Sequence, residues 1–410
     1  MKKYLLFLVM FCMLFDVCKG GEISDSDNPL SKYKCESNEI LYISLFCDPM
    51  KLSTLNGWGA NLTSNTYGED GVGRLKFDAA VTSIPDSAFF GNYLLSHIKM
   101  PDSVTSIGGG AFHSCSCLTS VTIPNGVTEI REGVFFGCSS MTTFYGKFTS
   151  ADNRCLIVDG VLTSFAPAGL TEYTIPDGVT SIGGGAFYGC DSLTSVTIPD
   201  SVTSIGGDAF FACHSLPSVT IPDSVTKIGY SAFANCSSLT SVTIPDSVTE
   251  IGEGAFSFCG RLKSVTIGNS VTEIGEGAFY DCGGLRSVTI GNSVTSIGRV
   301  AFRGCGSLTS VTIGNSVTEI GAGAFYDCGG LINVTIPDSV TSIGGDAFYG
   351  CGSLTSVYCK PTTPPRVIID ILSVFYINAV GRKIYVPTAS VEAYKSAWTD
   401  YADSIVGYDF

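Results

Sequence analysis

The chain has few of the side chains on which most enzymes and metal sites depend. Only three histidines occur, His97, His113 and His214, and none lies in a nucleophile motif with serine or cysteine. The glycines of residues 183–185 belong to a repeated turn, whereas a phosphate-binding loop follows a strand. Paired acids such as Glu250 and Glu253 recur with the repeat, as surface residues do. We therefore expect a non-enzymatic protein with no catalytic residue, cofactor or metal.

Positive charge and long apolar runs are scarce as well. The chain carries 23 lysines and arginines against 37 acidic residues, which gives a net charge of −14. No basic patch is present to neutralise phosphates, and this argues against a nucleic-acid partner. Beyond the N-terminus, no stretch approaches the roughly 20 apolar residues that a transmembrane helix needs.

The N-terminus is the exception to this pattern. Three residues, MKK, precede the apolar run Tyr4–Phe15, and small residues suited to cleavage follow at positions 18–20. This order is typical of a secretory signal peptide, which we predict over residues 1–20. Two fates remain open: cleavage after Gly20, or a lipid anchor on Cys18, whose preceding residues fit a bacterial lipobox poorly. In either case we expect a secreted or cell-surface protein.

What the chain does have is a repeat of 23 residues, seen cleanly in Leu193–Ser215. A Val-Thr-x-Ile signature followed by phenylalanine occurs eleven times from about residue 72 to residue 360. Fixed apolar columns at a fixed period predict a solenoid, in which each coil covers the apolar face of its neighbour. The valines are Val81, Val104, Val127, Val179, Val202, Val225, Val248, Val271, Val294, Val317 and Val340. The phenylalanines are Phe89, Phe112, Phe135, Phe187, Phe210, Phe233, Phe256, Phe279, Phe302, Phe325 and Phe348.

Each part of the unit predicts its own local structure. Residues 195–198 alternate polar and apolar β-branched side chains, as a half-buried strand does. Residues 199–201, Pro-Asp-Ser, predict a turn, and residues 202–205 a second short strand. Residues 209–213 place Ala209, Phe210 and Cys213 at i, i+1 and i+4, which predicts one helical turn.

The repeated wording LTSVTIPDSVTSIGGGAFYGC resembles the BspA-like class of leucine-rich repeats found on bacterial surface proteins. The resemblance implies an α/β-type leucine-rich repeat solenoid, curved, with parallel strands and short helical turns. It also implies adhesion to host matrix proteins, host cells or other bacteria.

Departures from the repeat divide the chain. We predict a tether and N-terminal cap over residues 21–71, repeats over 72–140, a hairpin-containing island over 141–169, repeats over 170–358 and a C-terminal cap over 359–410. Asp159 and Gly160 lie between two β-branched runs of the island, which favours a hairpin projecting from the array. Alternatively, the island only replaces a decayed repeat.

Two columns invite chemical interpretations that we set aside. One cysteine recurs per coil without a second ligand nearby, so we interpret the column as buried core rather than a metal or disulfide ladder. The column is Cys115, Cys138, Cys190, Cys213, Cys236, Cys259, Cys282, Cys305, Cys328 and Cys351. A column of Asp or Asn at the turns is explained by turn formation without calcium. Whether Cys35 and Cys47 form a disulfide stays open.

The candidate partner-binding residues lie on the outward side of the first strands. Serine and threonine form a lattice there, and larger or charged residues interrupt it towards its ends and in the island. Such sheets bind ligands in leucine-rich solenoids, although serine and threonine also suit any solvated strand. The candidates are His97, Lys99, Tyr145, Phe148, Arg154, Glu172, Thr197, Thr220, Thr243, Thr266, Thr289, Thr312 and Tyr358.

We interpret the chain as a monomeric surface protein that binds a protein or glycan on host or bacterial surfaces. A structural component of the cell surface is the second interpretation, and a uniform lattice would favour it. A carbohydrate-binding module is the third. An aromatic platform would favour that one, and the central lattice has none.

Overall fold

The computed structural model describes residues 28–368 and 374–410. The predicted leader, including Cys18, lies outside the described residues, as do residues 21–27 of the predicted tether. The chain divides into two compact units. Unit 1 holds the chain up to Thr171 together with Val179–Ser192, and unit 2 holds Glu172–Gly178 and Leu193–Phe410. None of the helices in the described ranges has the length and hydropathy needed to cross a membrane.

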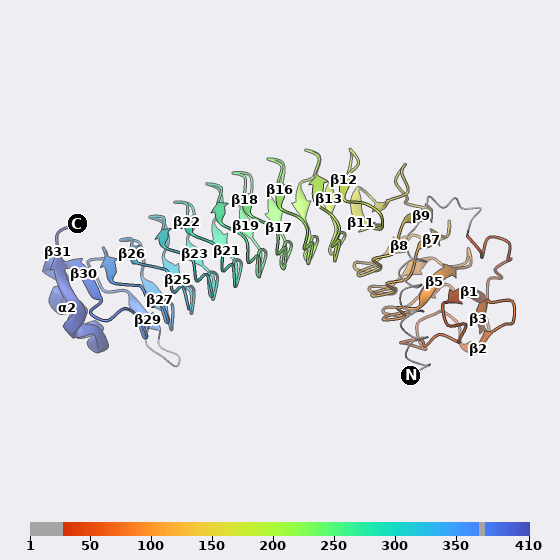
Figure 1. Cartoon of the computed structure of the whole chain (residues 1–410), viewed down its shortest axis with the longest axis horizontal. Helices are drawn as coiled ribbons and strands as arrows, with labels where there is room; N and C mark the ends of the chain where they lie inside the picture. Colours follow the sequence, from red (N-terminus) through yellow and green to blue (C-terminus); the bar gives the residue numbers. More distant parts are fainter. Residues whose placement is uncertain (1–27, 369–373) are drawn as a thin grey trace, which may run out of the picture. The chain divides into compact units, whose positions relative to one another are not determined.

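Each repeat of unit 2 forms one coil with a short strand on two of its sides (Figure 1). In the first strand the middle residue is buried and its neighbours face outward, as with Val219 between Ser218 and Thr220. The second strand buries only its isoleucine, as with Ile228. The first strands are β12 (Glu172–Thr174), β14 (Ser195–Thr197), β16 (Ser218–Thr220), β18 (Ser241–Thr243), β20 (Ser264–Thr266), β22 (Ser287–Thr289), β24 (Ser310–Thr312), β26 (Asn333–Ile336) and β28 (Ser356–Cys359). The second strands are β15 (Ser204–Ile205), β17 (Lys227–Ile228), β19 (Glu250–Ile251), β21 (Glu273–Ile274), β23 (Ser296–Ile297), β25 (Glu319–Ile320), β27 (Ser342–Gly344) and β29 (Arg366–Ile368).

Successive coils pair in parallel and in strict register. Ser218 lies opposite Ser241 and Thr220 opposite Thr243, so each side chain meets its equivalent one repeat later. The first strands form sheets in the orders β12-β14, β16-β18-β20-β22-β24 and β26-β28-β30-β31, in which β30 is Lys383–Pro387 and β31 is Ile405–Tyr408. This confirms the predicted solenoid of 23-residue coils.

The third side of the coil differs from the predicted helical turn. The backbone N–H groups of Phe210 and Ala212 donate to the carbonyls of Ala232 and Ala234 in the next coil, at 2.7 and 2.9 Å. Asp208 and Ala212 adopt positive φ angles of 53° and 58°. In a helix these N–H groups would donate to carbonyls of the same helix. Here every second N–H group donates to a carbonyl of the neighbouring coil. The segment is a run of turns that forms a third line of bonds between coils.

The core of unit 2 is a stack of phenylalanine rings with a parallel column of thiols. Neighbouring rings such as Phe233 and Phe256 lie 5.3 Å apart at an interplanar angle of 4°. Both rings are fully buried, and burying one such side chain contributes about 1.5–3 kcal/mol. The Cys259 thiol donates to the carbonyl of Phe233 at 3.2 Å, and the same contact recurs for Cys282 and Phe256. The burial of the column confirms its interpretation as core.

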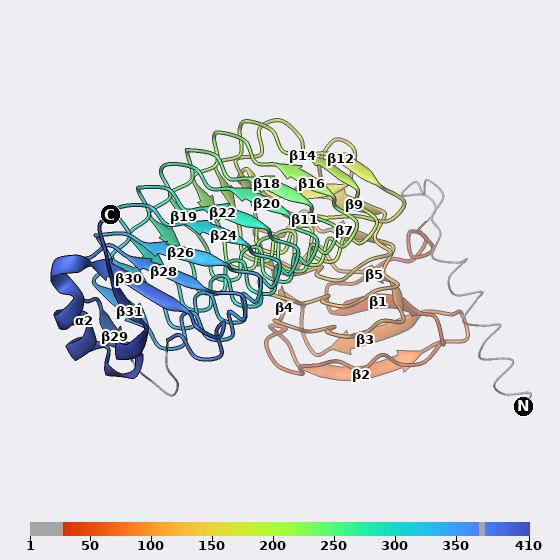
Figure 2. The same ribbon diagram turned by 60° about the vertical axis from the view of Figure 1, so that its left-hand side comes forward.

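Unit 1 begins with antiparallel strands and continues with parallel ones. Its main sheet has the order β2-β3-β1-β5-β7-β9, and the first three strands of that order are antiparallel to their neighbours (Figure 2). The predicted cap, residues 21–71, therefore extends further, because β3 belongs to its antiparallel part. The strands are β1 (Glu39–Ser44), β2 (Leu62–Tyr67), β3 (Gly73–Phe77), β5 (Leu95–Lys99), β7 (Ser120–Ile123) and β9 (Thr143–Gly146), with the second strands β4 (Ser83–Ile84), β6 (Ser106–Ile107) and β8 (Glu129–Ile130).

Trp58 closes the N-terminal end of the phenylalanine stack of unit 1. Its ring is fully buried and lies 5.3 Å from Phe77 and 5.6 Å from Phe89, which in turn stacks on Phe112 at 5.0 Å. The first coil would otherwise expose its apolar face to water, so the cap performs the role expected of it.

The two cysteines of the cap do not bond to each other in the structure. The Cys35 thiol donates to the carbonyl of Glu39 at 3.1 Å, and burial raises its pKa to about 12. Cys47 is exposed. Both cysteines are free thiols in the structure.

The island contains the predicted hairpin, but the hairpin does not project. Strands β10 (Cys155–Val158) and β11 (Val161–Phe165) are antiparallel around Asp159 and Gly160. Strand β11 also pairs in parallel with β13 (Ser181–Ile182), so it takes the place of a second strand. Because Leu156 and Leu162 are fully buried, the hairpin is part of the core of unit 1.

Replacing Gly160 by alanine is expected to destabilise unit 1 by about 1–2 kcal/mol, because both turn residues need positive φ. Asp159 and Gly160 have φ angles of 51° and 81°. A Cβ at position 160 would also lie 2.8 Å from Oγ1 of Thr180. Urea unfolding followed by Trp58 fluorescence measures the effect. Asp159→Asn, which tolerates the same φ, is the control, and equal midpoints for both variants would contradict this account.

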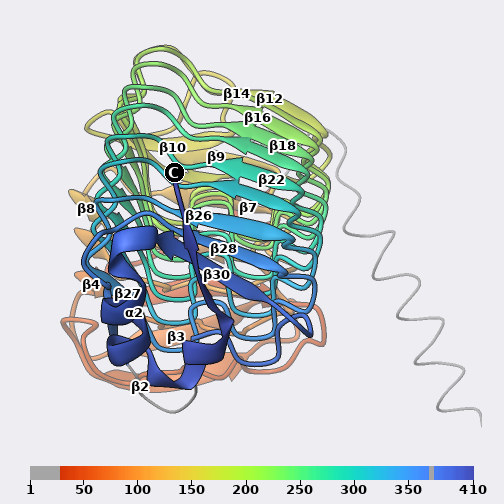
Figure 3. The ribbon, with the colours of Figure 1, turned by 90° about the vertical axis from the view of Figure 1, so that its left-hand side faces the viewer.

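The C-terminal cap closes unit 2 with a further coil and a helix (Figure 3). Residues 383–387 imitate a first strand, since β30 (Lys383–Pro387) pairs with β28. It is followed by η2 (Thr388–Ser390), α2 (Val391–Ala397), η3 (Thr399–Ser404) and β31 (Ile405–Tyr408). Ser390 does not cap α2 through its side chain, because its hydroxyl donates to the carbonyl of Thr362 at 2.7 Å. Tyr394 and Trp398 anchor the helix by donating to the carbonyls of Pro361 and Pro365.

Candidate functional site

The strand face of unit 2 consists of exposed hydroxyl groups. We define it as the outward side chains of strands β14 to β24, in two ranks. The serine rank is Ser195, Ser218, Ser241, Ser264, Ser287 and Ser310, and the threonine rank is Thr197, Thr220, Thr243, Thr266, Thr289 and Thr312. Each of these side chains is exposed. The threonine rank holds six of the predicted site residues, five of them on the strands of one sheet, β16 to β24.

The hydroxyls of the strand face differ from other hydroxyl columns in the same coils. Thr226 and Thr249, which directly precede second strands, donate to carbonyls of the preceding coil at 3.2 and 3.4 Å. Thr240, ahead of a first strand, does the same at 3.1 Å. Within the described residues, no hydrogen bond to protein engages the hydroxyls of the two ranks of the strand face. These hydroxyls are the ones that the fold leaves available to a ligand.

A groove of ≈ 510 Å³ lies along the edge of the strand face where the first strands end. It forms where the turn changes from Ile-Pro-Asp-Ser to Ile-Gly-Asn-Ser, so that Gly268 and Gly291 line it in place of proline rings. Its polar lining consists of Asp223, Thr243, Asp246, Thr266, Asn269 and Thr289. The groove thus joins the threonine rank to the column of turn carboxylates and amides.

The turn column itself has a structural task. The side-chain oxygen of Asp246 accepts the backbone N–H of Asn269 at 2.7 Å, and Asn292 does the same for Asn315 at 2.9 Å. Asp and Asn fill this role equally well, which explains why both occur in the column.

The two predicted residues at the N-terminal end have different contacts. Lys99 donates from Nζ to the carbonyls of Leu30 and Tyr33, at 3.3 and 2.7 Å. His97 lies 3.1 Å from the Ser96 hydroxyl through Nδ1, and burial lowers its pKa. The Lys99 side chain holds the cap against the first coils, whereas the His97 ring contacts Ser96 and Thr119 of the coils themselves. Both residues belong to the main sheet of unit 1.

The three island residues do not converge on one site. Tyr145 lies on β9 opposite Thr122, on the outward side of the sheet of unit 1. Phe148 packs against the core of unit 1, and Arg154 donates from Nη1 to the carbonyl of Ala168 at 2.9 Å. Two of the three therefore stabilise the hairpin region.

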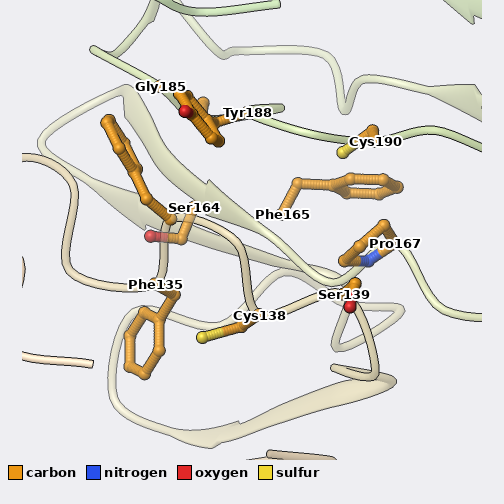
Figure 4. Close-up of a pocket in the computed structure, with 11 residues that line it drawn as sticks. Phe135, Cys138, Ser139, Ser164, Phe165, Pro167, Gly185, Tyr188 and Cys190 are labelled. Carbon is orange, nitrogen blue, oxygen red and sulfur yellow. The ribbon is translucent and has the colours of Figure 1, made fainter. Parts of the chain in front are cut away.

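A small void beside the hairpin is too small for a ligand. It holds ≈ 10 Å³ and is lined by residues such as Phe135, Phe165 and Tyr188 (Figure 4). A space of this size admits at most one water molecule. It marks the place where the hairpin interrupts the stacking of phenylalanine rings.

The two remaining predicted residues lie at opposite ends of the strand face. Glu172 lies opposite Ser195 and continues the serine rank, whereas Tyr358 lies opposite Thr335 and continues the threonine rank. Two residues that the sequence analysis did not select join Tyr358, namely Tyr385 and Tyr408. The strand-like wording of residues 383–387 places Tyr385 in this rank, but no sequence signal places Tyr408 there.

Comparisons with known proteins agree with this architecture. A family model described as the BspA type leucine rich repeat region matches residues 61–156, 162–286 and 272–364. A leucine-rich repeat protein from Bacteroides ovatus has 26% identity and a TM-score of 0.51, over 88% of this chain and 99% of that one. The leucine rich repeat protein of T. pallidum has 36% identity and a TM-score of 0.40, over 45% of this chain and 86% of that one.

A leucine rich cell surface protein from Faecalibacterium prausnitzii has 27% identity and a TM-score of 0.44, over 80% of this chain and 94% of that one. No curated protein matches the chain in sequence.

Proposed function

Because the chain belongs to the BspA-type leucine-rich repeat family, we propose that it is a secreted or cell-surface protein that binds its partner across the strand face of unit 2. The partner is a protein or glycan on host or bacterial surfaces, and the role is adhesion without catalysis. The leader-like residues 1–20 support export.

The observation that carries the proposal is the contrast among hydroxyl columns. Two columns are spent on bonds between coils, while the two ranks of the strand face stay exposed and in register. A rigid row of donors and acceptors loses little conformational entropy on binding, which favours recognition of an extended partner. The repetition of the same hydroxyls in every coil supports binding rather than catalysis, since no coil concentrates reactive groups.

The double variant Thr243→Glu with Thr289→Glu tests the proposal. We expect its binding to immobilised host matrix proteins and to bacterial cells to fall by about tenfold or more, because two carboxylates enter the centre of the strand face. The two positions lie two coils apart, roughly 10 Å, which limits repulsion between the new charges.

The matched control is Ser296→Glu with Ser342→Glu on the second strands. It adds the same charge at the same spacing, in a column where Glu250, Glu273 and Glu319 already occur. Equal binding by both double variants would overturn the assignment of the strand face. A wild-type chain that binds none of these surfaces would instead favour the structural role, to which the uniformity of the strand face also points.

A further inference from the structure

Three tyrosines form an aromatic cluster at the C-terminal end of the first-strand sheet of unit 2. We call Tyr358, Tyr385 and Tyr408 the tyrosine wall. Tyr358 and Tyr385 stack with centroids 4.9 Å apart at 14°, and Tyr408 meets both edge-on at 5.6 Å. Tyr408 is 43% exposed. The strands that carry them, β28, β30 and β31, lie in order at the end of unit 2 (Figure 2).

The tyrosine wall continues the threonine rank. Tyr358 lies opposite Thr335 of β26, and Tyr385 lies opposite Tyr358, so residues 335, 358 and 385 occupy equivalent positions in successive coils. Neighbouring strands are about 4.8 Å apart, close to the ring spacing, so the phenol rings stand upright on the sheet. The exposed hydroxyls of the serine and threonine ranks, which we call the hydroxyl floor, therefore end at the ring of Tyr358. We call this boundary between Thr335 and Tyr358 the aromatic step.

The half-buried ring of Tyr358 is covered by another aromatic ring on one of its two faces only. Tyr385 covers the side of the Tyr358 ring that is turned away from Thr335. On the other side the neighbour is Thr335, whose side chain is too short to cover a phenol ring. Within the described residues, the rings that contact Tyr358 are those of Tyr385 and Tyr408, and neither lies on the Thr335 strand.

The polar groups around this step are mostly neutral. Asn333 precedes Thr335 by two residues on the same exposed side of β26, and it lies opposite Ser356. The serine and threonine ranks that lead up to the step carry no charged side chain. Two lysines lie at this end, Lys383 opposite Ser356 and Lys360 two residues after Tyr358.

We propose that the tyrosine wall and the adjoining hydroxyl floor bind a neutral oligosaccharide, with one sugar ring stacked on the Thr335 side of the Tyr358 ring. A sugar ring has an apolar C–H face that suits an aromatic ring, and hydroxyls at its rim that suit amide and hydroxyl partners. A neutral floor matches a neutral, polyhydroxylated chain extending along the ranks. This rests on the proposed function and names the class of partner for the same face.

The experiment measures binding of neutral hexasaccharides (malto-, cello-, xylo- and manno-oligosaccharides) to the full secreted chain by calorimetry. We expect at least one to bind, and Tyr358→Ala to weaken its binding by about tenfold or more through loss of the stacking surface. Tyr358→Phe keeps the ring and is expected to bind within about threefold of wild type.

Tyr326→Ala is the matched control, because Tyr326 belongs to a different stack in unit 2, with Tyr349 at 4.6 Å. It removes the same side chain and should leave sugar binding unchanged. Circular dichroism checks that each variant is folded. Equal affinity of Tyr358→Ala and Tyr326→Ala, or no binding of any hexasaccharide at millimolar concentration, overturns the inference.

The outcome is separable from that of the proposed function. If no hexasaccharide binds while the Thr243 and Thr289 double variant still loses its surface binding, the strand face binds a protein and the present inference fails alone. If a hexasaccharide binds at Tyr358 but surface binding is indifferent to both double variants, adhesion through the strand face fails instead.

Discussion

Raising the pH to 10 is expected to remove about 7 kcal/mol from the unfolding free energy of unit 2, through five buried thiols alone. Burial raises the pKa of Cys259, Cys282, Cys305 and Cys328 well above the ordinary value of 9.0, and that of Cys351 to about 12. Each thiol then costs about 1.4 kcal/mol at one pH unit above its unfolded-state pKa. Domains are typically stable by about 5–15 kcal/mol, so the loss is comparable to the whole stability.

The direction follows from proton binding. Above pH 9 the unfolded chain releases the thiol protons, whereas the folded chain keeps them, so the unfolded state gains stability as the pH rises. The contribution is complete below about pH 9 and is lost between about pH 9 and pH 12, the folded value of Cys351. Urea unfolding at pH 7 to 10, in reducing buffer and followed by circular dichroism, measures the decline.

The triple variant Cys259→Ser, Cys282→Ser and Cys305→Ser isolates the thiols from tyrosine and lysine, which also titrate in this range. A serine hydroxyl also donates to the phenylalanine carbonyl but does not ionise. The variant should lose about 4 kcal/mol less than wild type between pH 7 and pH 10. Parallel pH profiles for the two proteins would show that the buried thiols do not control alkaline stability.

The second large effect is expected from Phe256→Ala, which should cost about 3–5 kcal/mol by opening a cavity in the ring stack. Phe256 is fully buried between Phe233 and Phe279, at 5.3 and 5.4 Å. Coils contact only their immediate neighbours, so the lost ring also weakens the coupling between the two ends of unit 2. We expect urea unfolding to separate into two transitions.

The two tryptophans of the chain make this observable. With Trp58→Phe as background, Trp398 in the C-terminal cap reports the end of unit 2, while circular dichroism reports all strands. Phe258→Ala is the control in the same coil, because Phe258 is 49% exposed. It should cost no more than about 1 kcal/mol. A single coincident transition in Phe256→Ala, or equal costs for the two variants, would contradict the stack as the source of cooperativity.

The repeat made most of the fold predictable, because every coil has to bury the same apolar columns against its neighbour. Alternation around Val219 is enough to predict the first strand, and the invariant register follows from the fixed period. The helical turn predicted for the third side of the coil was wrong, because apolar residues at i, i+1 and i+4 suit a series of turns as well as a helix. The bonds that decide between them, such as Phe210 to Ala232, run to the next coil and leave no trace in local spacing.

The sequence was enough to predict the serine and threonine ranks of the candidate site, but not the arrangement of the residues at its two ends. Thr243 and Thr266 follow directly from strand alternation. The dipeptide Asp159-Gly160 predicted a hairpin, but only the pairing of β11 with β13 shows that the hairpin fills the core. Tyr408 reaches the tyrosine wall because the chain returns to the sheet after α2, and such a return depends on tertiary packing.

Because the coils are in strict register, the number of repeats in unit 2 sets the length of the strand face. Because these coils pair in the same register, adding or removing an interior repeat is expected to preserve the strand pairing of its neighbours. Every added repeat would move the tyrosine wall about 4.8 Å further from Glu172 at the other end of the strand face. The distance between the two ends of the strand face is therefore expected to change in steps of one strand spacing with the number of repeats, while the residues at both ends stay the same.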